Sequence, residues 1–226
     1  MTTVDATPGN SAQPGQPAEE AAPAPAVVGP LAGDPAMLGL GSFIVGSVAL
    51  GLGLVGVVPV GVLGAPLAII LAATALGLIL ASIWCAALGQ SAVAAVFGIF
   101  GTFWLSYAVL VLGLDHNWFA ITAIAVLATV KLFLVSWLVI IVMLTLATLR
   151  LPLAFSVLFA LVALALLMLL LAFAEASAAG PSTGLLKTGG YVVLVFAALG
   201  VYLFFSASSV GTGGKAFPLG APVLHG

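Results

Sequence analysis

Uncharged hydrogen-bond donors are the residues of this chain best suited to contact a polar solute. They gather at the start of one apolar segment and within it, as Gln90, Ser91, Thr102, Trp104, Ser106 and Tyr107. Amide, hydroxyl and indole groups, with the free amides of a helix start, can hold a small anion that is partly stripped of water. Taken singly, each residue is more often a packing or interface residue, so the interpretation depends on where the fold places them.

Lys131 is the charged residue that lies deepest inside an apolar segment. A charge at the centre of a membrane-spanning helix costs at least ~2.5 kcal/mol on insertion scales, so it is usually retained for a function. Its segment is longer than one crossing needs, and the side chain can also extend along the helix toward one membrane face. Lys131 is therefore either a cation that lines a pore and attracts an anion, or an anchor near the interface.

Acidic and imidazole groups are missing from the middle of the apolar segments. His116 falls in a predicted loop and His225 in the C-terminal tail, and Cys85 lies in an apolar run without metal-ligand spacing. A proton relay or an intramembrane hydrolase needs buried carboxylates, histidines or metal ligands. We expect a protein that is not an enzyme and that holds no metal or cofactor.

The overall composition places these groups in a lipid bilayer. Hydrophobic residues make up 64% of the 226 residues and charged residues 4%, which leaves too little polar surface for a water-soluble protein. The formal net charge of -2 offers no basic face for nucleic acid. Membrane lipid is the expected surrounding, and nucleic acid is excluded as a partner.

Six apolar segments of about the length of one helical crossing follow one another along the chain. They lack the alternation of barrel strands, so the sequence predicts an all-α, multi-pass membrane protein with six transmembrane helices. The expected segments are 37–58, 66–87, 92–112, 118–148, 153–174 and 188–209.

The regions outside these segments differ in composition. Residues 1–33 are rich in Pro and Ala and predict a disordered tail, residues 34–210 form the six-helix domain, and residues 211–226 form a C-terminal tail. An even number of crossings places both termini on one side. Arg150 and Lys215 lie on that side and only Lys187 on the other, which favours cytoplasmic termini.

Small residues form a stripe along the first predicted helix. They recur at spacings of three and four, as Gly39, Ser42, Gly46, Ala49, Gly53 and Gly56. In lipid, such a face allows the backbones of two helices to approach closely. We expect it to pack against a neighbouring helix, with the lining of a pore as the alternative.

The stretch before this stripe resembles a family signature. Asp34-Pro35-Ala36-Met37-Leu38-Gly39-Leu40 is similar to the Asn-Pro-Ala-Pro-Leu-Gly-Leu motif of the acetate uptake transporter family, which comprises acetate/succinate-proton symporters and acetate anion channels. Pro35, Ala36, Leu38, Gly39 and Leu40 agree with it. The segment Phe100-Gly101-Thr102-Phe103-Trp104-Leu105-Ser106 resembles the family's Tyr-Gly-Ser-Phe-Trp-Leu-Thr, and further similarities continue in order to about residue 220.

This resemblance implies a hexamer in the plasma membrane in which each protomer has its own path, narrowed by apolar side chains. Phe43 and Phe100 match two of the narrowing residues, and the third lies near Val162. A bulky ring among glycines can act as a barrier by excluding water. The alternative is that both are ordinary phenylalanines of the bilayer core.

Several polar positions depart from the family pattern. Asp34 replaces Asn, so a group that could donate to a carboxylate becomes an acceptor. Gln90 replaces Asn, Phe100 lacks the hydroxyl of Tyr, and Cys85 stands where an acidic residue is usual. These differences concern the solute and its coupling rather than the architecture.

The leading hypothesis is a passive or proton-coupled conduit for small carboxylates such as acetate, extending to succinate. Gln90, Ser91, Thr102, Ser106 and Lys131 are the candidate contacts of the solute. A channel for a neutral solute such as urea or ammonia is the second hypothesis, and a membrane scaffold that transports nothing is the third.

Overall fold

The computed structural model of the chain describes residues 32–58, 64–177 and 180–224, and most of them are helical. The predicted disordered segment, residues 1–33, lies almost entirely outside the described residues. Within them, six helical spans are long and apolar enough to cross a membrane, which confirms the predicted fold class. The elements are α1 (Ala36–Val55), α2 (Leu67–Ile69), η1 (Ile70–Ala75), α3 (Leu76–Ala87), α4 (Ser91–Asp115), α5 (Ala123–Ala147), η2 (Thr148–Arg150), α6 (Leu153–Ala174) and α7 (Thr183–Gly211).

The first helix ends earlier than the prediction of residue 58, and glycine is the reason. Gly56 adopts a left-handed conformation with φ of 90°, which residues with a side chain rarely adopt. The amide of Gly56 donates to the Gly53 carbonyl, and the amide of Val57 donates to the Leu52 carbonyl at 3.1 Å. These bonds close the last turn of α1 in the manner of a glycine cap.

Boundaries of other spans also differ from the prediction. The fourth span begins at Ala123 rather than at residue 118, because Asn117 and Ala120 have positive φ values and interrupt the helix. The last span begins at Thr183, five residues before the predicted start, and extends to Gly211. Apolarity alone marks the part of a helix that lies in lipid, whereas backbone conformation sets its ends.

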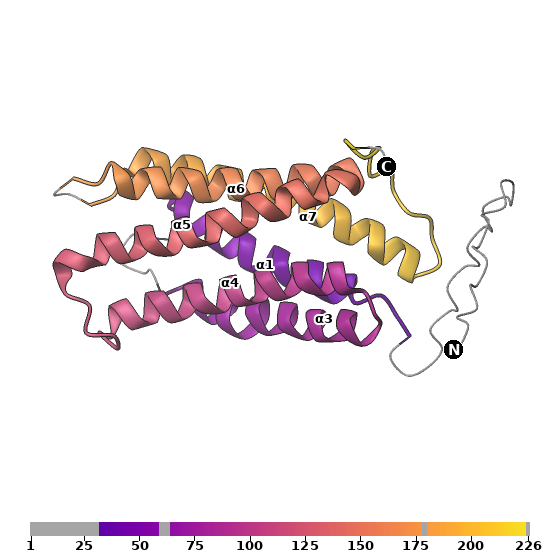
Figure 1. The fold of residues 1–226 in the computed structure, drawn as a ribbon, viewed down its shortest axis with the longest axis horizontal. Coiled ribbons are helices and arrows are strands. Elements are labelled where there is room, and N and C mark those ends of the chain that lie inside the picture. Colours follow the sequence, from indigo (N-terminus) through magenta and orange to yellow (C-terminus); the bar gives the residue numbers. More distant parts are fainter. Residues whose placement is uncertain (1–31, 59–63, 178–179, 225–226) are drawn as a thin grey trace, which may run out of the picture.

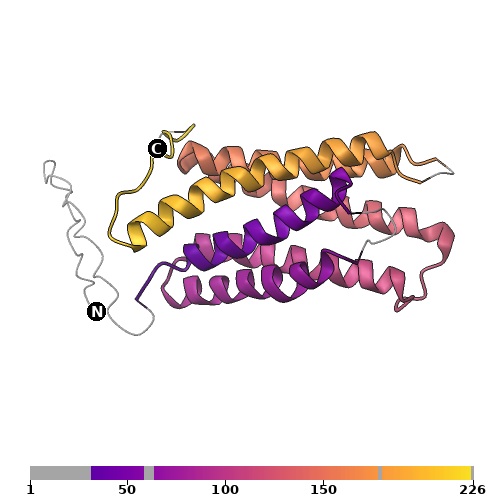
Figure 2. The ribbon, with the colours of Figure 1, turned by 180° about the vertical axis from the view of Figure 1, so that it is seen from behind.

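The helices lie side by side along the long axis of the molecule (Figure 1). Helices α6 and α7 run along one edge, α3 and α4 along the other, and α1 and α5 lie between them. Viewed from behind, α1 lies between α7 and α3 (Figure 2). The start of α1 and the end of α7 share one end of the bundle, here called the terminal end, and the α3–α4 turn and the α5–α6 junction lie there too.

Packing between the helices is uneven. Helix α1 packs closely on α7, α7 on α6, α6 on α5, and α3 on α4. The small-residue stripe of α1 faces α4 at Gly39 and the second span at Gly46, since a Cβ at Gly39 would collide with Phe97 and one at Gly46 with Thr74, whereas a Cβ at Gly53 would meet no atom within 4 Å. The packing role predicted for these two positions is confirmed. In contrast, the described backbones of α4 and α6 make almost no close approach.

The second span contains a π-helical segment, η1, between α2 and α3. Such segments widen the helix locally and occur often at functional sites. The segment contacts both α1 and α4, and it includes the fully buried Thr74.

The C-terminal tail folds back on the terminal end of the bundle. The amide of Ala154 donates to the Leu219 carbonyl at 2.9 Å, and the Leu224 amide donates to the Leu149 carbonyl at 2.9 Å. The hydroxyl of Tyr202 donates to the Pro218 carbonyl at 2.8 Å. Residues 218–224 therefore connect α7 to the α5–α6 junction.

Candidate functional site

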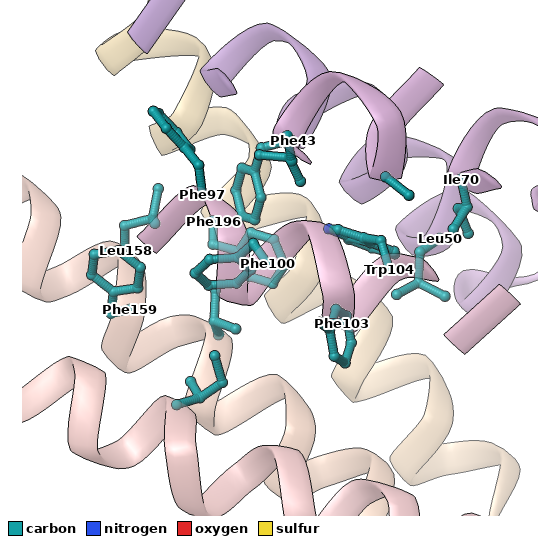
Figure 3. Close-up of a cluster of buried hydrophobic side chains, with 14 of the residues drawn as sticks. Phe43, Leu50, Ile70, Phe97, Phe100, Phe103, Trp104, Leu158, Phe159 and Phe196 are labelled. Atoms are coloured by element: carbon teal, nitrogen blue, oxygen red, sulfur yellow. The ribbon is translucent and has the colours of Figure 1, made fainter. Parts of the chain in front are cut away.

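Four phenylalanine rings meet in the interior of the bundle. Phe43 of α1 contacts Phe100 of α4 edge to face, with ring centroids 5.2 Å apart, and Phe196 of α7 at 5.6 Å. Phe100 also stacks on Phe159 of α6 at 5.6 Å. Figure 3 shows these rings converging from four helices. We call Phe43, Phe100, Phe159 and Phe196 the central aromatic cluster.

The central aromatic cluster occupies a space that the backbones leave open. Helices α4 and α6 hardly approach each other, yet the Phe100 and Phe159 rings connect them. All four side chains are buried, with exposed fractions from 3% to 5%. A junction filled by aromatic rings is apolar and excludes water, which is the physical basis of a hydrophobic constriction.

Glycines lie next to aromatic rings on α1 and α7. At Gly200 of α7, a Cβ would lie 3.2 Å from Cγ1 of Ile44 and in ordinary contact with Phe43, 3.7 Å from its Cδ1. At Gly39 of α1, a Cβ would overlap the ring of Phe97, which is buried beside the cluster. The small residues near Phe43 thus allow rings to lie directly against helix backbone.

Val162 extends the apolar lining by one turn. It is 6% exposed and follows Phe159 by three residues on α6, so the two side chains share a face of that helix. Phe43, Phe100 and Val162, which the resemblance singled out, are therefore all in or next to one cluster. Sequence reasoning did not identify Phe159 and Phe196, although both lie in the interior of their predicted spans.

The polar candidates of the sequence lie elsewhere. Gln90 and Ser91 are exposed at the α3–α4 turn, on the terminal end. Thr102 is exposed, and its hydroxyl donates to the Gly98 carbonyl at 2.9 Å. The Ser106 hydroxyl donates to the Phe103 carbonyl at 2.9 Å, also in its own helix. None of these four side chains joins the central aromatic cluster.

Lys131 is half-buried on α5, a helix that contributes no ring to the central aromatic cluster. Within the described part of the chain, its ammonium group forms no ion pair. Its flank of α5 borders the outward face, where Leu132 and Val135 are exposed. The structure thus places Lys131 at the edge of the bundle's packed interior.

The signature stretch forms the start of α1. The amide of Ala36 donates to Oδ1 of Asp34 at 2.9 Å, so the exposed carboxylate satisfies one of the free amides of the first turn. Pro35 is fully buried and Gly39 receives the Phe97 ring. Asp34, Pro35 and Gly39 thus fix how α1 begins and how closely it approaches α4.

Two buried polar atoms lie next to the central aromatic cluster without a hydrogen-bond partner among the described residues. They are the Trp104 indole nitrogen, Nε1, and the Thr74 hydroxyl oxygen, Oγ1. Trp104 is 2% exposed and Thr74 is 0% exposed. Sequence reasoning named Trp104 only as one donor among several and did not single out Thr74. No group of His, Cys, Asp and Glu able to hold a metal ion occurs in the described ranges.

Comparison with known proteins supplies an independent view of this arrangement. The sequence model described as the GPR1/FUN34/yaaH family matches residues 18–214. The solved structure of the bacterial acetate channel SatP is similar to this fold, with a TM-score of 0.71 and 20% sequence identity, over 83% of this chain and 99% of that one. No match was found among curated proteins.

Proposed function

Because the chain belongs to the GPR1/FUN34/yaaH family, the acetate uptake transporters that its motifs resemble, we propose that it conducts small monocarboxylates such as acetate across a membrane. Each protomer contains one path, which runs between α1, α4, α6 and α7. Phe43, Phe100 and Val162 narrow it, together with Phe159 and Phe196.

The central aromatic cluster is the observation that carries this proposal. Helix α1 brings its backbone close to the second span through small residues. Helices α4 and α6 instead stay apart and are joined by rings. Aromatic side chains can change rotamer or shift to admit a small solute, whereas packed backbones cannot.

We propose passive conduction rather than coupling through a buried proton relay. The acidic residues of the described spans lie at their ends, with Asp115 the last residue of α4 and Glu175 just after α6. Asp34 is exposed and engaged with the first turn of α1. A proton that accompanies the solute then crosses as part of the undissociated acid.

The assembly we propose is a homo-hexamer in the plasma membrane with cytoplasmic termini. Its support is the family and the outward face of α5, where Leu132 is 69% exposed and Val139 is 61% exposed to lipid or to a second protomer. Arg150 and Lys215 belong to the terminal end and Lys187 to the opposite end, which favours the cytoplasmic side for the termini.

The polar candidates receive different roles in this proposal. Gln90 and Ser91 flank the mouth of the path at the terminal end, where exposed amide and hydroxyl groups meet hydrated solute. Lys131 is an anchor whose ammonium group reaches toward the interface. Thr102 and Ser106 have packing roles, since their hydroxyls already donate to the backbone of α4.

Uptake of radiolabelled acetate by proteoliposomes that contain the full chain tests the proposal. We expect protein-dependent uptake with and without a pH gradient, and competition by unlabelled acetate but not by urea. Uptake that occurs only with a pH gradient would refute passive conduction. Urea flux that acetate does not inhibit would favour a neutral-solute channel, and the absence of any flux would favour a scaffold.

A further inference from the structure

The two unpartnered polar atoms beside the central aromatic cluster belong to different helical elements, but they lie at about the same distance from the terminal end of the bundle. Trp104 follows Phe100 by four residues and therefore lies on the same face of α4, one turn farther from the terminal end. Gly46 follows Phe43 by three residues, also about one turn, on α1, which runs in the same direction as α4. The Thr74 side chain lies against Gly46, so Thr74 and Trp104 both lie one turn beyond the Phe43–Phe100 contact.

Neither polar atom has a hydrogen-bonding role in the described part of the chain. A buried hydroxyl or indole group normally finds a hydrogen-bond partner, and leaving one unpaired costs about 1–3 kcal/mol. Threonine hydroxyls in membrane helices usually donate to their own backbone, as those of Thr129 and Thr145 do here. The Thr74 hydroxyl lies in the π-helical segment η1 and forms no such bond with any described residue.

The indole of Trp104 is oriented toward the cluster. In Figure 3, it lies between Phe100 on one side and Leu50 and Ile70 on the other, and the edge that carries the nitrogen faces the phenylalanine rings. The indole ring system also makes edge-to-face contacts with Phe103 and Tyr107, at centroid distances of 5.2 Å and 6.4 Å. The N–H group is therefore held in place and available to an acceptor inside the path.

We propose that Trp104 Nε1–H and the Thr74 hydroxyl form a binding site for the carboxylate group of the solute, directly beyond the central aromatic cluster. This inference rests on the proposed function and specifies its binding site. A short monocarboxylate fits both parts of the surroundings: its two oxygens accept from the indole and the hydroxyl, and its alkyl end contacts phenylalanine rings and Val162. Hydrogen bonds to an ionised group are stronger than neutral ones and offset part of the cost of removing water.

The substitution Trp104→Phe removes the N–H group and keeps an aromatic ring. We expect the half-saturation concentration for acetate uptake to rise about tenfold, which corresponds to about 1.4 kcal/mol. Thr74→Val removes the hydroxyl at nearly constant shape and should weaken acetate binding without lowering the thermal midpoint, because it also removes an unpaired polar group. Thr74→Ser, which retains a hydroxyl, should keep most of the wild-type affinity for acetate. Trp137→Phe, the same change on α5, is the matched control and should leave uptake unaltered.

Binding is measured separately by nuclear magnetic resonance of the four indole N–H groups of the wild-type protein in detergent. Titration with sodium acetate should shift the Trp104 signal downfield, whereas sodium chloride should not. Each of the single variants Trp84→Phe, Trp118→Phe and Trp137→Phe loses one indole signal, and the Trp104 signal is the one present in all three. The assignment therefore does not require Trp104→Phe to fold.

Two results overturn the inference: an indole signal that acetate leaves unchanged, or wild-type half-saturation in both Trp104→Phe and Thr74→Val. Failure of the proposed function is a different outcome, because the wild-type protein would then show no acetate flux. The titration still decides whether the site binds acetate in that case.

Discussion

Two aromatic clusters lie along α4, and they differ in what they connect. The central aromatic cluster joins α4 to α1 and α6 through Phe100, and α1 to α7 through Phe43. The second, here called the α4–α5 cluster, consists of Phe103, Tyr107, Phe133 and Trp137. Its closest pair, Phe103 and Trp137, meets edge to face at 5.3 Å.

The difference lies in the surroundings rather than in the rings. The α4–α5 cluster fastens α5, the least buried of the spans, to a neighbour whose backbone it barely contacts. The nitrogen of Trp104, a buried polar atom without a described partner, faces the central aromatic cluster, whereas the α4–α5 cluster contacts the ring of Trp104. We therefore assign the proposed path to the rings that the unsatisfied donor faces, and attachment to the rings that join the outer helix to the bundle. Trp104 links both, since its ring contacts Phe103 and its nitrogen faces Phe100.

The largest expected effect is on solute selectivity and follows from removing an aromatic ring of the proposed path. Phe100→Ala removes the contacts with Phe43 and Phe159 and widens the constriction. We expect the permeability to succinate relative to acetate to rise roughly tenfold, the scale on which apolar pockets discriminate by size. Parallel flux assays with both labelled acids in proteoliposomes measure this ratio.

Phe133→Ala is the matched control for Phe100→Ala, because it removes a ring of the α4–α5 cluster. An unchanged ratio in Phe100→Ala, or an equal change in both variants, would contradict the assignment of the path to the central aromatic cluster.

The second effect is on stability, and it is expected from a change in the α4–α5 cluster. Phe133 contacts Phe103, Tyr107 and Trp137 at centroid distances of 6.0, 6.3 and 6.3 Å. Phe133→Ala should lower the free energy of unfolding by about 1.5–4.5 kcal/mol, since each of these three aromatic pairs contributes about 0.5–1.5 kcal/mol. Thermal unfolding in detergent measures the loss, while acetate flux per folded protomer should match that of the wild type. A selective loss of flux at full stability would show that α5 takes part in conduction.

The smallest effect concerns a region outside both clusters. Tyr202→Phe removes the hydrogen bond to the Pro218 carbonyl, which holds the C-terminal tail against α7. We expect a decrease of about 1 kcal/mol in the free energy of unfolding, the usual net contribution of one hydrogen bond, and no change in solute preference. Faster amide hydrogen exchange at Leu224 and Ala154 would accompany it. Slow exchange at both amides in the variant would show that Tyr202 does not hold the tail.

The number, type and approximate position of the spans follow from the sequence. In lipid every backbone polar group needs a partner within its own segment, so about twenty consecutive apolar residues form a helix whatever surrounds them. Family membership was equally accessible, because Pro35, Gly39 and the Phe100-Gly101 step occur in the expected order. Helix ends were harder to predict from the sequence, because the backbone conformation of a single residue, such as Gly56 or Ala120, decides where a helix begins or ends.

The composition of the candidate site was decided by tertiary structure. Phe159 and Phe196 are two of 13 phenylalanines, and only the packing of α6 and α7 brings their rings to Phe43 and Phe100. Side-chain type marked Thr102 and Ser106 as donors, but their hydroxyls are already used by the α4 backbone. In the sequence, Thr74 resembles any threonine in an apolar run, and only the structure shows that its hydroxyl has no described hydrogen-bond partner. The sequence by itself determined that this chain spans a membrane as six helices, because that depends on each segment alone, whereas the fold decided which side chains face one another across the bundle.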